Sequence, residues 1–111
     1  MQYTITPHKR CGLIKITGRV DGSTSPRLEA GLREIMDTGM YNIVVDMSEV
    51  DFMSSAGWWV LIETQKECKK GSRGETVLVG VSDKIHTSLN LVGMDTYFKI
   101  FTEQTEAVGS F

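Results

Sequence analysis

Two adjacent serines, Ser54 and Ser55, are the residues of this 111-residue chain whose position best suits a chemical role. They follow an apolar, strand-like run and a short acidic segment, and an amphipathic helical pattern begins directly after them. The first backbone N–H groups of a helix have no partner within the helix, so a serine hydroxyl there can act as a cap. The same groups and the helix dipole would stabilise a phosphate. The pair therefore fits either an ordinary N-cap or a regulatory phosphorylation site.

Four further polar residues precede the serines or lie near them in the sequence. Asp21 lies in a loop, which is typical of an Asx-turn or of a residue that begins a helix, and Thr24 fits a helix cap better than a partner contact. Asp46 ends an apolar strand pattern, where a carboxylate is costly unless it is hydrogen-bonded. We expect it either to bond the backbone around the serines or to be a solvated strand end. Asp51 is expected to be a loop carboxylate.

Two consecutive tryptophans, Trp58 and Trp59, open the helix after the serines. Successive helical residues point about 100° apart, so both indoles cannot face the core equally. Trp58 shares a stripe with Leu61 and Ile62 and is predicted to be core. Trp59 is four residues after Ser55, on the spacing that brings helical side chains together. It is predicted to be a partner anchor or to be partly buried against a neighbouring helix.

The elements that must position these residues alternate regularly between strand and helix. The apolar periodicities and the turn residues predict the order ββαβαβαβα, with an N-terminal hairpin first. This order implies an α/β fold in which a mixed sheet is covered by helices. The expected ranges are strands at 3–6 and 13–17, a helix capped by Ser25 and ended by Gly39, a strand at 42–47, a helix from the serines to Lys70, a strand at 76–81, a helix at 82–92, a strand at 97–101 and a short helical tail.

Composition limits the functions that this chain can have. The length leaves room for one domain over residues 1–111, and 41% hydrophobic with 23% charged residues is typical of a soluble globular protein. A net charge of −2 without a basic run argues against direct nucleic-acid binding. No apolar run approaches the roughly 20 residues of a membrane span, so a cytoplasmic location is expected. Cys11 and Cys68 are distant in sequence, and His8 and His86 are isolated, so no metal site or cofactor is predicted.

Several segments of the chain resemble STAS domains of the bacterial anti-sigma factor antagonist family. Residues 52–57 (FMSSAG), between a strand and an amphipathic helix, resemble the signature of that family most specifically. Residues 18–21 (GRVD), followed closely by 23–26 (STSP), resemble the turn before its first helix. Residues 91–94 (LVGM) and 97–100 (YFKI) resemble its C-terminal helix-to-strand turn. The resemblance spans essentially the whole chain and implies a single STAS domain.

The resemblance also implies a role for individual residues. It assigns the phosphoacceptor to Ser55. Many relatives have aspartate before the acceptor, whereas this chain has Ser54, which becomes a possible competing acceptor. The family commonly has leucine and then glycine or a basic residue where this chain has Trp58 and Trp59. The residues expected at the partner surface are Asp21, Thr24, Ser54, Ser55, Gly57 and Trp59.

The function implied by the resemblance is a protein-interaction switch rather than an enzyme. The unphosphorylated domain would bind an anti-sigma factor that is also a serine kinase of the histidine-kinase-like ATPase type. Phosphorylation of Ser55 by that partner would end the interaction, and a serine phosphatase would restore it. The alternatives left open are a STAS subunit of a larger regulatory or transport assembly and a small-ligand or nucleotide sensor. The absence of a G-x-x-x-x-G-K-[ST] run weakens the sensor, and the absence of G-x-S-x-G weakens a serine hydrolase.

Overall fold

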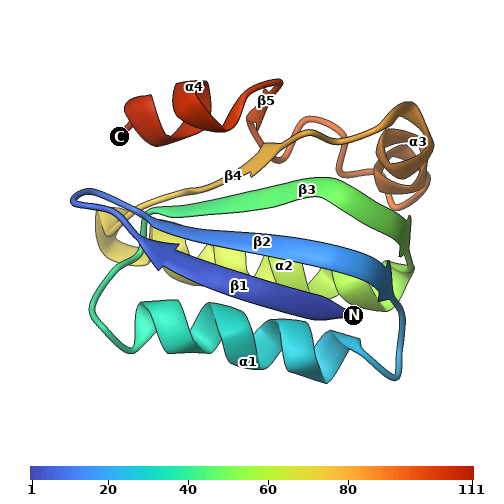
Figure 1. The fold of residues 1–111 in the computed structure, drawn as a ribbon, viewed down its shortest axis with the longest axis horizontal. Coiled ribbons are helices and arrows are strands. Elements are labelled where there is room, and N and C mark those ends of the chain that lie inside the picture. The colour runs from blue at the N-terminus through green and yellow to red at the C-terminus, as the bar shows by residue number, and fades with distance from the viewer.

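A five-stranded sheet forms the centre of the protein (Figure 1). The structure, a computed structural model, describes residues 1–111. The strands lie in the order β1-β2-β3-β4-β5, with β1 antiparallel to β2 and all other neighbours parallel. The elements are β1 (Gln2–Pro7), β2 (Gly12–Val20), α1 (Ser25–Met36), β3 (Ile43–Met53), α2 (Ser55–Lys69), a 3-10 turn (Lys70–Ser72), β4 (Thr76–Val79), α3 (Asp83–Leu91), β5 (Ile100–Phe101) and α4 (Gln104–Gly109). The predicted order of strands and helices is confirmed.

Helices cover both faces of the sheet. Figure 1 shows α1 and α2 side by side on one face, α4 on the opposite face and α3 beside the end of β3. The larger core lies beneath α1 and α2 and also contains Ile85 and Leu89 of α3. A smaller core under α4 includes Val44, Val77 and Ala107. The central strands are therefore buried on both faces, as their continuous apolar runs predict.

Several boundaries differ from the sequence-based expectation, and three of them matter most for the site and the sheet. Residues 48–51, expected to be an acidic loop, belong to β3 because β2 continues to pair with β3 as far as Val20 opposite Met53. The first helix begins one residue earlier than expected, with Thr24 rather than Ser25 at the N-cap position. The last strand is only Ile100–Phe101, because the chain before it turns through a hydrogen bond from Tyr97 N–H to Met94 O.

Candidate functional site

The two serines occupy different positions at the start of α2. Ser54 is the N-cap: its backbone is extended, and its Oγ accepts a hydrogen bond of 3.4 Å from the Gly57 N–H. The Ser54 N–H donates to the carbonyl oxygen of Val20 at 2.9 Å, which joins the start of α2 to the end of β2. Ser55 is exposed in the first turn, and its hydroxyl makes no hydrogen bond within the protein. Ser54 therefore stabilises the helix, while the hydroxyl of Ser55 remains available for chemistry.

Gly57 brings the start of α2 close to the sheet. A Cβ at this position would lie 2.8 Å from both Met53 Sδ and Val20 Cγ1, so a larger residue would push the helix away from β2 and β3. Gly57 is buried. Gly57 has no side chain that could contact a partner. In the structure it allows the serine turn to lie close to the ends of β2 and β3.

Asp21 and Thr24 build the turn that follows β2. The Asp21 carboxylate accepts hydrogen bonds from the Ser23 N–H at 2.9 Å and the Ser23 hydroxyl at 2.7 Å, and from Arg19 Nε at 3.0 Å. These bonds, first that of the Ser23 hydroxyl and then that of Arg19, hold the pKa of Asp21 well below its usual value. Thr24 Oγ1 accepts from the Asp21 N–H at 2.8 Å.

The turn geometry bears on two sequence-based predictions. The Asx-turn predicted for Asp21 is confirmed, since its carboxylate accepts from the backbone N–H two residues on. Thr24 occupies the N-cap position of α1, but its side chain makes no capping hydrogen bond to the helix. The turn is adjacent to the serines through the Val20–Ser54 backbone bond. Contact of Asp21 and Thr24 with a partner stays a prediction.

The two tryptophans point to different environments. Trp58 is fully buried, as predicted, and its Nε1–H donates to Ser88 Oγ of α3 at 2.8 Å. Ser88 in turn donates to the carbonyl oxygen of Ile85 at 2.7 Å. Trp59 is 50% exposed, one helical turn beyond Ser55. The polar link between Trp58 and Ser88 joins α2 to α3, and no local pattern in the sequence indicates it.

Asp46 has neither of the two roles predicted for it. It lies within β3 rather than at a strand end, is only 5% exposed and does not bond the serine turn. Its carboxylate accepts from the Ser48 N–H at 2.9 Å, from the Ser48 hydroxyl at 2.7 Å and from Gln104 Nε2 of α4 at 2.8 Å. Burial raises the pKa of Asp46, but the bonds from Ser48 and Gln104 outweigh it, so the pKa is lowered overall. Asp46 therefore holds α4 on the sheet.

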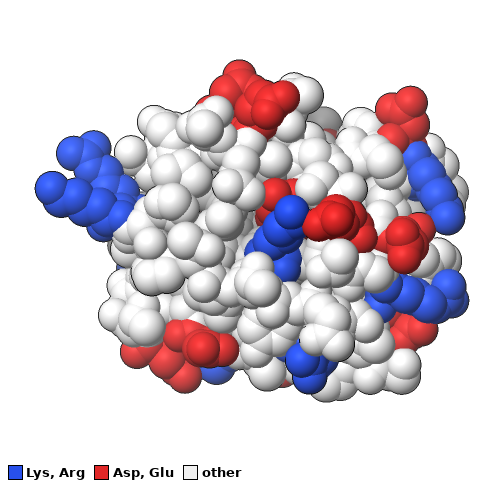
Figure 2. Space-filling model, in the orientation of Figure 1, with Lys and Arg blue, Asp and Glu red and all other residues white.

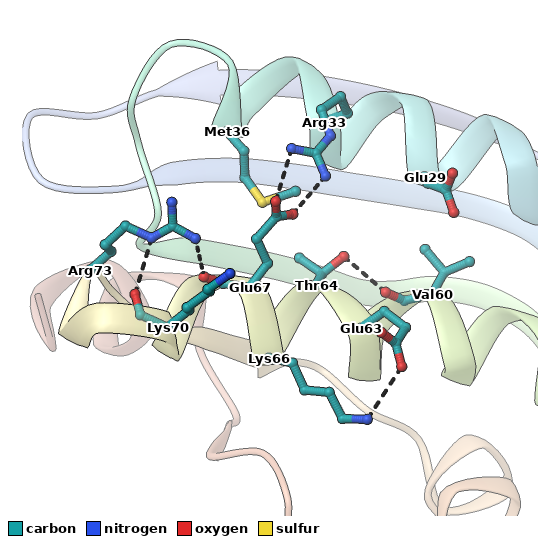
Figure 3. Close-up of a pocket in the computed structure, with 10 residues that line it drawn as sticks. All are labelled: Glu29, Arg33, Met36, Val60, Glu63, Thr64, Lys66, Glu67, Lys70 and Arg73. Atoms are coloured by element: carbon teal, nitrogen blue, oxygen red, sulfur yellow. Dashed lines mark hydrogen bonds and ion pairs between the residues drawn. The ribbon is translucent and has the colours of Figure 1, made fainter.

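A groove of about 820 Å³ runs between α1 and α2, the two helices that cover one face of the sheet (Figure 3). Most of the side chains that line it are charged, and most of these form ion pairs or hydrogen bonds within the protein. Arg33 donates two hydrogen bonds, of 2.6 and 3.2 Å, to the carboxylate of Glu67. Lys66 pairs with Glu63 at 3.3 Å, and Arg73 donates to the backbone oxygens of Lys70 and Glu67. Neither Ser54 nor Ser55 lines this groove. The serine turn and the groove are thus separate features of the surface.

Charged groups and potential metal ligands also occur over the rest of the molecule. Figure 2 shows acidic and basic groups interspersed on one face, with the largest basic projection at the turn between β1 and β2. No group of three or more His, Cys, Asp or Glu side chains is arranged to hold a metal ion. Cys11 and Cys68 are free, buried thiols, and burial raises the pKa of each. None of the helices combines the length and hydropathy needed to cross a bilayer.

A family model described as the STAS domain matches residues 2–107. The chain belongs to the STAS domain family. The fold agrees with this assignment, because the chain superimposes on Bacillus SpoIIAA in its phosphorylated form with a TM-score of 0.76 and 15% identity, covering 98% of each chain. Against the unphosphorylated form of SpoIIAA the TM-score is 0.83, again at 15% identity, covering 98% of this chain and 95% of the other.

Two curated relatives of this STAS domain are anti-sigma factor antagonists. It is 26% identical over 108 residues to the anti-sigma-F factor antagonist RsfB of Mycobacterium tuberculosis, covering 95% of this chain and 84% of RsfB. It is 30% identical over 81 residues to an anti-sigma-B factor antagonist of Staphylococcus aureus, covering 73% and 74% of the two chains. The predicted family and mixed α/β fold are therefore confirmed.

Proposed function

We propose that this STAS domain is an anti-sigma factor antagonist controlled by phosphorylation of Ser55. The observation that carries the proposal is the exposed Ser55 hydroxyl at the first turn of α2, in a family whose curated relatives are anti-sigma factor antagonists. Ser54, the competing acceptor, is half-buried and already accepts the Gly57 N–H. The site is therefore better suited to receive a phosphate on Ser55 than on Ser54.

The partner in this proposal is an anti-sigma factor that is also a serine kinase and that brings its own ATP. The Ser55 Oγ attacks the γ-phosphorus, the Oγ–P bond forms, and the bond between that phosphorus and the oxygen of the departing ADP breaks. A base of the kinase accepts the hydroxyl proton. A serine phosphatase reverses the change by hydrolysis. This chain supplies the acceptor and its position, not the catalytic groups, so it is a substrate and regulator rather than an enzyme.

The physical effect of the phosphate explains the release of the partner. A phosphoserine adds a charge of about −1.5 to −2. At the centre of a contact surface this charge must lose solvation when a partner approaches, which opposes binding. Within the free domain, the first-turn N–H groups and dipole of α2 offset the same charge. We therefore expect phosphorylation to end the complex while leaving the fold intact.

A phosphorylation assay with defined partners tests the proposal. The probes are the purified anti-sigma factors of the organism that encodes the chain, each incubated with the domain and ATP. We expect one phosphate per domain, mapped by mass spectrometry to Ser55, and none in Ser55→Ala. Ser54→Ala is the matched control and should still be phosphorylated. Phosphate found on Ser54 alone, or neither binding nor phosphorylation with any of these proteins, would contradict the proposal.

A second candidate is a STAS subunit of a larger regulatory or transport assembly. It is favoured by the likeness to a sulfate transporter family protein of Wolinella succinogenes, with a TM-score of 0.71 and 25% identity over 88% of this chain and 81% of the other. Such a subunit would bind its assembly irrespective of the phosphorylation state of Ser55. Comparing the binding of wild type and Ser55→Asp separates the two candidates, since only the switch predicts a loss.

A further inference from the structure

A hollow of about 340 Å³ lies between the end of β1, the turn that follows it and the C-terminal part of α1. It shares no lining residue with the groove between α1 and α2. Gly12, which lines the hollow, pairs with Ile43 at the start of β3, whereas Ser55 follows the other end of that 11-residue strand. At about 3.3 Å per residue, the hollow and the serine turn are roughly 30 Å apart.

The floor of the hollow is apolar. Its apolar side chains are those of Ile5, Pro7, Ile35 and Met40. A Cβ added at Gly12 would lie 2.6 Å from Ile35 Cγ2, so β2 packs directly against Ile35 and closes the hollow toward the core. Pockets that bind small molecules have volumes of about 300 to 1,000 Å³ and mostly apolar walls. The hollow therefore has the size and the lining to receive a small apolar group.

Glu34 is the one Asp, Glu, Lys or Arg residue that lines the hollow. Its side chain is exposed and forms no ion pair, and it accepts a single, long hydrogen bond of 3.5 Å from the Tyr3 hydroxyl. Glu34 also lies in the last turn of α1, which ends at Met36, so the negative end of the helix dipole adds to its charge. This part of the hollow therefore favours a positively charged group.

The basic residues close to Glu34 in the sequence or in the hollow do not neutralise it. Arg33 is bound on the other side of α1 by its ion pair across the groove. Lys9 and Arg10, in the turn between β1 and β2, are exposed and do not line the hollow. His8 lines the hollow but makes no hydrogen bond or ion pair with Glu34. The carboxylate of Glu34 thus remains available to a ligand.

We propose that this hollow binds a small primary amine that carries an apolar chain or ring. The ammonium group lies on the Glu34 carboxylate as a charge-assisted hydrogen bond, and the apolar part lies against Ile5, Ile35 and Met40. A ligand with a carboxylate of its own would bring like charges together at Glu34 and at the end of α1, which opposes binding. The proposal goes beyond the phosphorylation switch, because it gives the domain a second site, remote from Ser55, for a free small molecule.

Titration of the whole domain with three related compounds tests the charge that the site requires. The probe is 2-phenylethylamine, followed at pH 7 by the backbone amide signals in NMR spectra of the isotope-labelled domain. The alcohol 2-phenylethanol has the same apolar group without the charge, and L-phenylalanine adds a carboxylate. We expect the amine to bind with a Kd of about 1 mM or below, which is within reach of a ligand of this size, and the other two about tenfold more weakly. The largest signal changes should fall in residues 5–12 and 34–40.

Variants of the domain test the residues that hold the amine. Glu34→Gln keeps the shape of the side chain without its charge and should raise the Kd of 2-phenylethylamine about tenfold. Glu29→Gln is the matched control, since Glu29 is an exposed glutamate of the same helix that does not line the hollow, and its Kd should stay within about twofold of wild type. Ile5→Ala should raise Kd a few-fold by removing an apolar contact. Circular dichroism of each variant confirms that it is folded.

Four results would overturn the proposal. They are the absence of saturable binding of the amine, equal affinities for the amine and the alcohol, equal Kd values in Glu34→Gln and wild type, and signal changes confined to residues outside the hollow. Tighter binding of L-phenylalanine than of the amine would reject the amine as the ligand class and indicate an amino acid site. None of these results bears on the switch at Ser55, because no kinase takes part in the titrations.

Discussion

Ser54 and Ser55 carry the same side chain, and their backbone positions give them different roles. The extended backbone of Ser54 directs its Oγ back to the Gly57 N–H, whereas Ser55 is already helical and its hydroxyl faces solvent. Of the two roles that the sequence left open for both serines, the structure shows capping by Ser54, and it leaves the hydroxyl of Ser55 without a partner in the protein. The acceptor role itself stays a proposal.

Removing each hydroxyl in turn measures this separation. Ser54→Ala should lower the free energy of unfolding by about 1 kcal/mol, the usual cost of removing an N-cap. Ser54→Asp should restore most of it, because aspartate caps as well as serine and its charge interacts favourably with the helix dipole. Ser55→Ala should change the value by less than about 0.5 kcal/mol, as for a surface substitution. Urea denaturation monitored by circular dichroism gives the free energy of unfolding of all three variants. An equal loss of stability in Ser54→Ala and Ser55→Ala would show that both hydroxyls cap α2.

The neighbouring tryptophans give a second residue-level contrast, now in packing. Trp58→Ala should destabilise the fold by roughly 3 to 5 kcal/mol, because it removes a fully buried aromatic side chain. Trp59→Ala should cost less than about 1 kcal/mol. Ser88→Ala leaves the buried indole N–H of Trp58 without its acceptor and should cost about 1 to 3 kcal/mol. If Trp59→Ala proves as destabilising as Trp58→Ala in the same urea titrations, Trp59 is part of the core and cannot serve as a partner anchor.

At the scale of elements, α3 and α4 are each joined to the rest of the fold by a polar contact between residues far apart in the sequence. α4 is six residues long and has one buried residue, Ala107, so apolar packing alone holds it weakly. The bond from Gln104 Nε2 to Asp46 ties α4 to β3. α3 is similarly tied to α2 through Ser88 and Trp58. We therefore expect the packing of α3 and α4 to be sensitive to single substitutions at these contacts.

The Asp46 contact predicts a pH dependence. The folded pKa of Asp46 is lowered, so its ionised form stabilises the fold above the unfolded pKa of about 3.9, and this contribution is lost as the pH falls through the folded value. Asp46→Asn should therefore be less stable than wild type at pH 7, by about 1 to 3 kcal/mol, and the difference should shrink below about pH 4. Urea denaturation at pH 7 and pH 3 measures it. Asp51 is an exposed residue of the same strand, so Asp51→Asn is the control and should have the wild-type free energy of unfolding at both pH values. If Asp46→Asn is less stable than wild type by the same amount at both pH values, the predicted pH dependence is wrong.

At the scale of the whole molecule, the two cores share the strands of one sheet. Val44 and Val45, adjacent in β3, face the smaller and the larger core respectively. Loss of either core would expose the sheet that supports the other, so we expect residues 1–111 to behave as one cooperative domain. The site at the start of α2 is held at the end of this sheet by the bond between Ser54 and Val20.

This arrangement predicts that a negative charge at Ser55 alters binding without altering the fold. Ser55→Asp should unfold in a single transition, with the midpoint in urea close to that of wild type, because the residue is exposed and aspartate in a first helical turn interacts favourably with the dipole. Its affinity for the anti-sigma factor should fall at least tenfold. Tryptophan fluorescence and circular dichroism should report the same midpoint. Separate transitions in the two signals would contradict one cooperative domain, and a large shift of a single midpoint would show that the charge disturbs the fold itself.

Local patterns in the sequence determined the order of elements, the helix start at the serines and the burial of Trp58. These features depend on periodicity, glycine positions and capping chemistry, all of which act over a few neighbouring residues. The resemblance of residues 52–57 to the STAS signature also indicated the family. The sequence also separated Trp58 from Trp59 correctly, since a rotation of 100° per residue requires it.

Only the tertiary structure decided the features that join distant segments. Residues 48–51, which include the acidic Glu49 and Asp51, form strand because β2 supplies backbone partners there, although their composition is typical of a loop. Gln104 meets Asp46 from 58 residues away, and Ser88 meets Trp58 from 30 residues away. Each contact joins side chains that the packing of helices on the sheet brings together, and no local pattern records which pairs will meet. The serine turn was visible in the sequence because a helix N-terminus is a local structure, whereas the contact between α2 and α3 through Trp58 and Ser88 became visible only in the folded chain.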